Sequence, residues 1–224
     1  MTLLAPREAY RLWAPTYEDG NVITHLEQRL VARLGPSPAR LRLLDAGCGT
    51  GARMAGMTAA RAVGVDLSPE MLAMGRDNPA LGGIELIEGD LRALPVSDRA
   101  FDLVWCRLAI GYVAELAEAY AELARAADLG GSVIVTDFHP AASAAGHRRT
   151  FRHDGGSYRL ETFPHSADRQ IEAAARAGLA LRTWAEAEIG PEVRHFYAEA
   201  GRETLYAEHC GLPVVLALAF NRDG

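Results

Sequence analysis

Three glycines and a carboxylate near the start of the chain have the types and spacing of a nucleotide-binding turn. Gly47, Gly49 and Gly51 follow a short apolar run, and Asp66 stands nineteen residues after Gly47 at the end of a second apolar run. Glycine allows the backbone to approach a ligand closely and to take positive φ angles. A carboxylate at the end of a strand can accept hydrogen bonds from both hydroxyls of a ribose. These residues predict a site for a ligand that contains a nucleoside.

The same loop fits two kinds of cofactor. It matches the relaxed G-x-G-x-x-[GA] fingerprint from Gly47 to Ala52, which would make the chain an NAD-dependent oxidoreductase. Asp45 favours another ligand, because a carboxylate just before the first glycine can reach a cationic amino group and would repel a pyrophosphate. Asp90 follows a further strand and can accept a hydrogen bond from the exocyclic amine of an adenine, with the Leu91 amide beside it. The carboxylates therefore favour an adenosine that carries an amino-acid group.

The elements that must position these residues follow from the pattern of apolar runs. Helical spacing predicts helices over 21–34 and 168–177, after Ser68-Pro69, and around 116–123. Strands are predicted over 41–46, 62–66, 84–88, 101–106, 132–137, 179–185 and 213–220. Alternating strands and helices indicate a parallel sheet with right-handed crossovers. The glycine loop would then lie at the carboxyl edge of the sheet, where it opens a helix.

Three segments of the chain resemble the motifs of a known enzyme family. LDAGCGTG, VGVDLSPEML and GDLRALPVSDRAFDLV are similar to the first, second, and third and fourth motifs of class I S-adenosylmethionine-dependent methyltransferases, especially the small-molecule branch related to ubiquinone-biosynthesis enzymes. The resemblance covers residues 9–137 well. It implies a Rossmann-like, doubly wound, mostly parallel seven-stranded sheet. It also implies S-adenosyl-L-methionine as cofactor, S-adenosyl-L-homocysteine as product, and a small-molecule acceptor methylated on oxygen, nitrogen or activated carbon.

The resemblance also implies a cofactor site, residue by residue. The three loop glycines would pack against the methionine and ribose, Asp66 would bind the ribose hydroxyls, and Asp90 and Leu91 would bind the adenine. Leu67 is a further predicted cofactor contact. The N-terminal segment 10–19 resembles the family's tyrosine-bearing lid. The remaining predicted cofactor contacts are Tyr17 over the methionine end, Asp45, and the backbone of Arg107.

Residues after the fifth predicted strand are candidates for the acceptor side. His139 follows that strand at the ligand-binding edge, so it is the predicted general base. Asp137 would fix the tautomer of His139 if the two side chains touch. An arginine cluster that starts at Arg148 and includes Arg152 could clamp an acceptor's carboxylate or phosphate. The further predicted acceptor contacts are Tyr10, Trp13, His147, Arg149 and His165. No metal is expected, because the histidine spacings between 139 and 165 match no standard zinc pattern.

Length and composition restrict the class of protein. The chain has 224 residues and a net charge of −6, which argues against a dedicated nucleic-acid binder. All of its Lys and Arg positions are arginine, so no lysine is available as a base or Schiff-base former. Three scattered cysteines indicate a reducing compartment, and no apolar run is long enough for a membrane helix, so a cytoplasmic location is expected. A non-catalytic, cofactor-binding paralogue or partner subunit is the remaining alternative. The acceptor and the oligomeric state stay open.

One domain is predicted, with four parts. Residues 1–40 would form an N-terminal helical lid and 41–137 the cofactor-binding core. Residues 138–168 would form a His/Arg-rich insert on the substrate side, folded as a hairpin lid, and 169–224 would complete the sheet.

Overall fold

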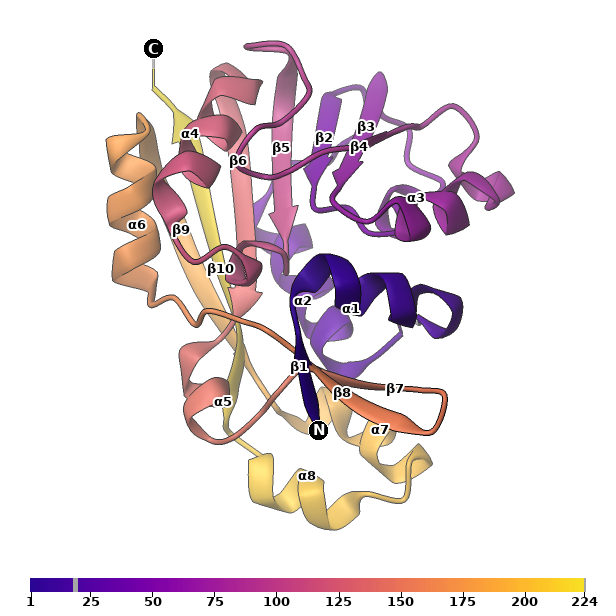
Figure 1. The fold of residues 1–224 in the computed structure, drawn as a ribbon. Coiled ribbons are helices and arrows are strands. Elements are labelled where there is room, and N and C mark those ends of the chain that lie inside the picture. The colour runs from indigo at the N-terminus through magenta and orange to yellow at the C-terminus, as the bar shows by residue number, and fades with distance from the viewer. Residues whose placement is uncertain (18–19, 224) are drawn as a thin grey trace.

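A seven-stranded sheet forms the centre of the molecule in the computed structural model, which describes residues 1–17 and 20–223 (Figure 1). Its strand order is β4-β3-β2-β5-β6-β10-β9, and only β10 runs antiparallel to its neighbours. The order reverses at the β2–β5 pair, which creates the crevice where such sheets bind ligands. The strands are β2 (Arg42–Ala46), β3 (Arg61–Asp66), β4 (Glu85–Glu88), β5 (Phe101–Arg107), β6 (Ala127–Phe138), β9 (Leu179–Glu188) and β10 (Pro213–Arg222). The predicted mostly parallel, seven-stranded fold is confirmed.

Helices cover both faces of this sheet, so its central strands are buried on two sides, whereas the edge strands β4 and β9 keep exposed residues. The side chains of β2 show this division, because Leu43 packs into the cluster with α2 and Leu44 into the opposite cluster with α4. Figure 1 shows α4 and α6 together beside β6, β9 and β10. The helices are α2 (Val22–Leu34), α3 (Pro69–Arg76), α4 (Leu116–Ala126), α5 (Pro140–Ala144), α6 (Ala167–Arg176), α7 (Arg194–Glu199) and α8 (Glu203–His209), besides α1 described below. Among the described residues, no helix has both the length and the apolar character needed to cross a bilayer.

Side-chain caps fix where several of these helices begin, α2 and α3 among them. Asn21 forms a capping box with Thr24 at the start of α2. The Ser68 hydroxyl accepts a hydrogen bond from the Met71 amide, and Pro69 occupies the first position of α3. The predicted cap at Ser68-Pro69 is therefore confirmed.

The glycine loop differs from the expectation in one respect, since no α-helix follows it. Residues Ala52–Met54 form a single 3-10 turn, and the chain reaches β3 at Arg61. Gly56 takes a positive φ of 71° just after that turn, which ends the helical geometry. The loop packs directly against α3 instead, because a Cβ on Gly75 would lie 2.2 Å from the Thr50 carbonyl oxygen.

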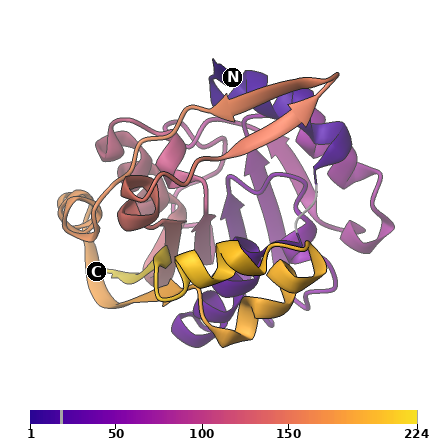
Figure 2. The ribbon, with the colours of Figure 1, turned by 90° about the horizontal axis from the view of Figure 1, so that it is seen from below.

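A second, three-stranded sheet lies across the carboxyl ends of the parallel strands (Figures 1 and 2). Strand β1 (Thr2–Leu4) pairs in parallel with β8 (Gly156–Leu160), which forms a hairpin with β7 (Thr150–His153). Helix α1 (Pro6–Trp13) packs against this sheet through Ala9, and the Trp13 ring stacks on Phe151 at 5.2 Å. The N-terminal segment and the insert thus share a small apolar core, a pairing that the sequence did not indicate.

Candidate active site

A cavity of about 350 Å³ lies at the carboxyl edge of the sheet, between the glycine loop and α1. Its volume is within the range of small-molecule sites. Segments that are distant in the chain form its walls: α1, the glycine loop, the ends of β3 and β4, and the turn after β5. Predicted cofactor residues that line it are Tyr17, Gly47, Gly49, Asp66, Leu67, Asp90, Leu91 and Arg107.

Two glycines of the loop are required where they stand. Gly47 has a φ of +82°, and a Cβ there would lie 2.4 Å from the Cβ of Ala109. Gly49 has a φ of +60° and also lines the cavity. The predicted cofactor contact of Gly51 is corrected. Gly51 shares the positive φ, but it faces apolar side chains such as Leu86 and does not line the cavity.

Asp66 joins the glycine loop to α3. Its Oδ2 accepts a hydrogen bond of 2.7 Å from the Gly49 amide, and its Oδ1 accepts one of 2.9 Å from the Ser68 amide. Burial raises the pKa of this carboxyl, while the backbone amides oppose the shift. Each oxygen retains a lone pair, so the group can still accept hydrogen bonds from a ligand's hydroxyls.

Asp45 is wholly buried behind the loop and does not line the cavity. Neither of its oxygens has a hydrogen-bond partner among the described residues. Burial raises the pKa of its carboxyl to about 6, partly offset by the charges of Arg53 and Arg107. Asp45 was predicted to reach a ligand's amino group directly or through water, and the direct contact is corrected, because the carboxyl group is wholly buried and does not line the cavity.

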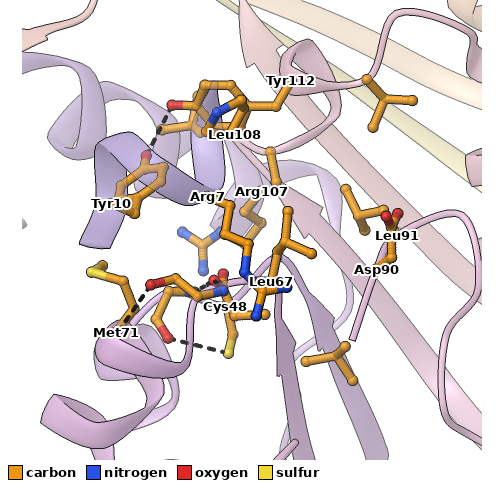
Figure 3. A pocket seen from close by; sticks show the side chains of 18 of the residues that line it. Arg7, Tyr10, Cys48, Leu67, Met71, Asp90, Leu91, Arg107, Leu108 and Tyr112 are labelled. Atoms are coloured by element: carbon orange, nitrogen blue, oxygen red, sulfur yellow. Dashed lines mark hydrogen bonds between the residues drawn. The ribbon is translucent and has the colours of Figure 1, made fainter. Parts of the chain in front are cut away.

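Asp90 and Leu91 lie across the cavity from Tyr10 in Figure 3. The Asp90 carboxylate accepts hydrogen bonds from the Arg92 amide and guanidinium, the shortest 2.6 Å. This pairing lowers the pKa of Asp90, so the group stays ionised. An incoming amine would share that carboxylate with Arg92.

Arg107 lines the cavity, but its side chain forms an ion pair inside the protein. Its guanidinium donates two hydrogen bonds, of 2.8 and 2.7 Å, to the carboxylate of Glu27 on α2. The two side chains are only 4% and 0% exposed. The backbone carbonyl, predicted to contact a cofactor, accepts a hydrogen bond of 3.0 Å from Arg53. The ion pair between Arg107 and Glu27 therefore joins α2 to the sheet.

Aromatic side chains close the side of the cavity under α1. The Tyr10 hydroxyl is 2.9 Å from that of Tyr112, as Figure 3 shows. Tyr17 packs edge-on against Tyr10 and Trp13 at ring distances of 6.0 and 5.2 Å. Tyr10 was predicted on the acceptor side, yet it lines this first cavity, while Trp13 does not.

Arg7, Tyr112 and Phe163 are among the residues that line the first cavity and that sequence reasoning missed. Arg7 forms an ion pair of 2.7 Å with Glu88 and so ties α1 to the end of β4. Residues 7 and 88 have no pattern in common, so only the fold could reveal their pairing. A signal for Tyr112 was available, because it follows the fourth parallel strand, where ligand contacts are expected.

A second cavity, of about 300 Å³, adjoins the first. Leu108, Tyr112, Arg149 and Phe163 line both cavities. The predicted acceptor residues Trp13, His147, Arg148 and Arg149 line it, together with Asp137. The structure thus brings the end of β6, the insert and α1 to one place.

Arg149 lies at the junction of the two cavities. Its guanidinium lies over the Phe138 ring at 4.8 Å and the Tyr112 ring at 5.5 Å. It also donates a hydrogen bond of 3.4 Å to the Leu108 carbonyl. Arg148, in contrast, donates to the carbonyls of Ser143 and His147, so the main chain holds its guanidinium.

His139 is not the base that the sequence predicted. The chain leaves β6 at Phe138, and His139 becomes the N-cap of α5, with Nδ1 accepting from the Ala141 amide. Its Nε2 is 2.9 Å from Glu186 on β9. The ring lines neither cavity, and its hydrogen bonds do not include Asp137.

The other two predicted histidines have mainly structural contacts. His165 is buried and lines neither cavity, and its Nε2 is 2.7 Å from the Val113 carbonyl, which fixes the segment before α6. His147 lines the second cavity and packs against the His209 ring at 4.3 Å. His165 is therefore removed from the predicted acceptor contacts.

Comparison with known proteins identifies the central region of the chain. A family model described as a methyltransferase domain matches residues 44–135. The malonyl-[acyl-carrier protein] O-methyltransferase of Dechloromonas aromatica (strain RCB) is 34% identical over 184 residues, which cover 78% of this chain and 65% of that protein. The chain spans less than two thirds of the length of such curated relatives.

Solved structures share the fold at lower sequence identity. An S-adenosylmethionine-dependent methyltransferase from Mesorhizobium loti has a TM-score of 0.68 and 22% identity, covering 88% of this chain and 98% of that chain. A [4+2]-cyclase has a TM-score of 0.66 and 19% identity, covering 97% and 94%. One fold therefore carries both chemistries, so the activity must be argued from the site.

Proposed function

Residues 44–135 match a family model described as a methyltransferase domain, and from this premise we propose that the chain transfers a methyl group from S-adenosylmethionine to a small-molecule acceptor. The observation that carries the proposal is the pair of adjoining cavities. The first contains the glycine loop and Asp66 and fits a nucleoside ligand. The second provides a separate space for an acceptor, next to the first.

The residues of the first cavity fit S-adenosylmethionine better than a dinucleotide. A pyrophosphate is usually bound by the amides at the N-terminus of an α-helix. The glycine loop here leads into a three-residue 3-10 turn, Ala52–Met54, which does not provide such a site. Asp66 would accept the ribose hydroxyls, and Asp90 with Leu91 would lie against the adenine.

The protein's part in the reaction is to align the two reactants and to exclude water. When bound, S-adenosylmethionine supplies a methyl group on a positively charged sulfur. An acceptor lone pair forms the new bond to the methyl carbon as the carbon–sulfur bond breaks, and the electron pair of that bond stays on sulfur. Tyr10 and Tyr17 would cover the first cavity from the side of α1, held there by the Arg7–Glu88 ion pair.

We propose further that the acceptor is an acid in its ionised form. Arg149 supports this, because its guanidinium lines both cavities and a planar guanidinium binds carboxylates well. The relatives named malonyl-[acyl-carrier protein] O-methyltransferases point to the same chemistry. An ionised oxygen already has the lone pair that the reaction needs, so no general base is required at the position predicted for His139.

The test is calorimetric binding of S-adenosylhomocysteine to the wild type and to Asp66→Asn. We expect wild-type binding and at least a tenfold loss in the variant, because hydrogen bonds to a charged group contribute roughly 1.5–3 kcal/mol. Asp77→Asn, an exposed aspartate at the end of α3, is the matched control and should bind normally. The proposal fails if S-adenosylhomocysteine does not bind, or if NADH rather than this ligand raises the melting temperature. Binding without transfer to any acid in a broad panel would instead favour a non-catalytic role.

A further inference from the structure

Asp137 is the buried acidic side chain that lines the second cavity, and sequence reasoning gave it only a role through His139. It stands at the end of β6, opposite Leu216 of β10, and is 2% exposed. We propose that Asp137 is the specificity-determining residue of this cavity and that its carboxyl group donates a hydrogen bond to an acceptor carboxylate bound by Arg149. This inference rests on the proposed function and names the recognition chemistry of the same site.

Buried polar groups hold the Asp137 carboxyl in a fixed orientation. Its Oδ1 accepts a hydrogen bond of 2.8 Å from the Phe138 amide, and its Oδ2 accepts one of 3.3 Å from the amide of Gln170 on α6. Gln170 is itself fixed, because its Oε1 accepts a hydrogen bond of 2.9 Å from the Tyr120 hydroxyl. These contacts fix a carboxyl group that lines the second cavity.

The turn after β5 is shaped to fit against this carboxyl group. A Cβ on Gly111 would lie 2.5 Å from Asp137 Oδ1, so a larger residue at this point of the 3-10 turn Ile110–Tyr112 would displace the carboxyl group. The next residue, Tyr112, lines both cavities. Asp137 therefore lies beside the segment that the two cavities have in common.

The surroundings of Asp137 favour its neutral form. Burial raises the pKa of its carboxyl to about 8, while the Phe138 amide and the charge of Arg149 oppose the shift. On the neighbouring strand β5 and helix α4, the titratable groups that interact electrostatically with Asp137 are Cys106 and Tyr120. Burial raises the pKa of both, so both are uncharged at neutral pH. His147 and Arg148 line the same cavity, and burial lowers the pKa of His147.

A neutral carboxyl group is chemically suited to an anionic acceptor. It offers an O–H donor, whereas an ionised carboxylate offers only acceptors and would repel the ligand. Arg149 would supply the positive charge on the other side of the bound acid. The pair would thus accept a carboxylate and reject an amine of the same size.

The experiment measures probe binding to the chain saturated with S-adenosylhomocysteine, by calorimetry at pH 7 and pH 9. Phenylacetate is the anionic probe, because aromatic rings such as Phe138 line the cavity, and phenylacetamide is the neutral probe of equal size. We expect phenylacetate to bind about tenfold more weakly at pH 9, since the neutral fraction of a group with a pKa near 8 falls to roughly one in eleven. The affinity for phenylacetamide should stay within about twofold.

Variants separate recognition from a structural role. Asp137→Asn keeps a donor that cannot ionise, so it should bind phenylacetate equally at both pH values. Asp137→Leu should bind it at least about tenfold more weakly at pH 7, without pH dependence. Asp154→Asn, at the exposed tip of the β7–β8 hairpin, should behave like the wild type.

Three results would overturn the assignment. The first is no binding of phenylacetate at pH 7, and the second is a wild-type affinity for phenylacetate that is equal at both pH values. The third is an affinity of Asp137→Asn for phenylacetate that falls from pH 7 to pH 9 as much as that of the wild type. If Asp137→Asn does not fold, the comparison of the two probes on the wild type decides. Failure of S-adenosylhomocysteine to bind refutes the proposed function itself. If S-adenosylhomocysteine binds but phenylacetate does not, only the role of Asp137 is refuted.

Discussion

Replacing Asp137 by Asn should change how the stability of the protein depends on pH. In the folded protein, burial raises the pKa of this carboxyl to about 8, whereas an unfolded aspartate has a pKa near 3.9. Between these values the folded chain keeps a proton that the unfolded chain has released. The free energy of unfolding therefore falls as pH rises through this window, and it becomes level above about pH 8.

The size of the effect follows from the linkage relation. One group that is protonated only in the folded state changes the free energy of unfolding by about 1.4 kcal/mol per pH unit. From pH 5.5 to 7.5 the wild type should thus lose on the order of 2–3 kcal/mol that Asp137→Asn does not lose. For a chain of this size, this corresponds to a relative change in melting temperature of roughly 4–12 °C.

The assay is thermal unfolding followed by circular dichroism, without ligands, at pH values from 4.5 to 8.5. Asp45→Asn is the matched control, because Asp45 is also fully buried but has a pKa of only about 6. The difference in melting temperature between Asp45→Asn and the wild type should change with pH below pH 6 and be constant from about pH 6.5 to 8. Wild-type and Asp137→Asn curves that stay parallel from pH 5.5 to 7.5 would show that Asp137 is already ionised, and would refute the reasoning.

Three further predictions concern other parts of the site. Gly47→Ala should reduce S-adenosylhomocysteine affinity at least tenfold by calorimetry, because its Cβ would lie 2.4 Å from the Cβ of Ala109 and its φ is +82°; an unchanged Kd would contradict this. Arg107→Met should lower the free energy of unfolding by about 3–5 kcal/mol in urea titrations, because it leaves Glu27 charged and buried without its partner. The double variant with Glu27→Leu should regain most of the lost free energy of unfolding. His139→Ala should keep methyl transfer within about twofold, with at most about 2 kcal/mol of stability lost with the α5 cap, and a tenfold fall in kcat would return the histidine to the mechanism.

The cofactor side of the site could be predicted from the sequence because its determinants are local. Gly47 and Gly49 are needed for the backbone angles of a single turn, and Asp66 ends the strand that follows. Parallel strands bring their carboxyl ends to one edge of the sheet, so residues that end successive strands meet there whatever lies between them. Even here the structure decided which residues line the cavity, since Asp45 and Gly51 do not.

The acceptor side depended on the tertiary structure. Asp137 lies near the end of β6 and His139 directly follows that strand, and no local pattern of residues favours the first over the second. The strand ends between them, so His139 turns away to cap α5, while the long-range contacts of Gln170 and Gly111 fix Asp137 in the cavity wall.

Motif spacing determined the fold and the cofactor class, because both depend on short-range geometry that repeats along the chain. The pairing of Arg107 with Glu27, the β1–β8 strand pair and the neutral state of Asp137 depend on which distant segments pack together and exclude water. Burial and charge are properties of that packing, and no local pattern of residues contains them.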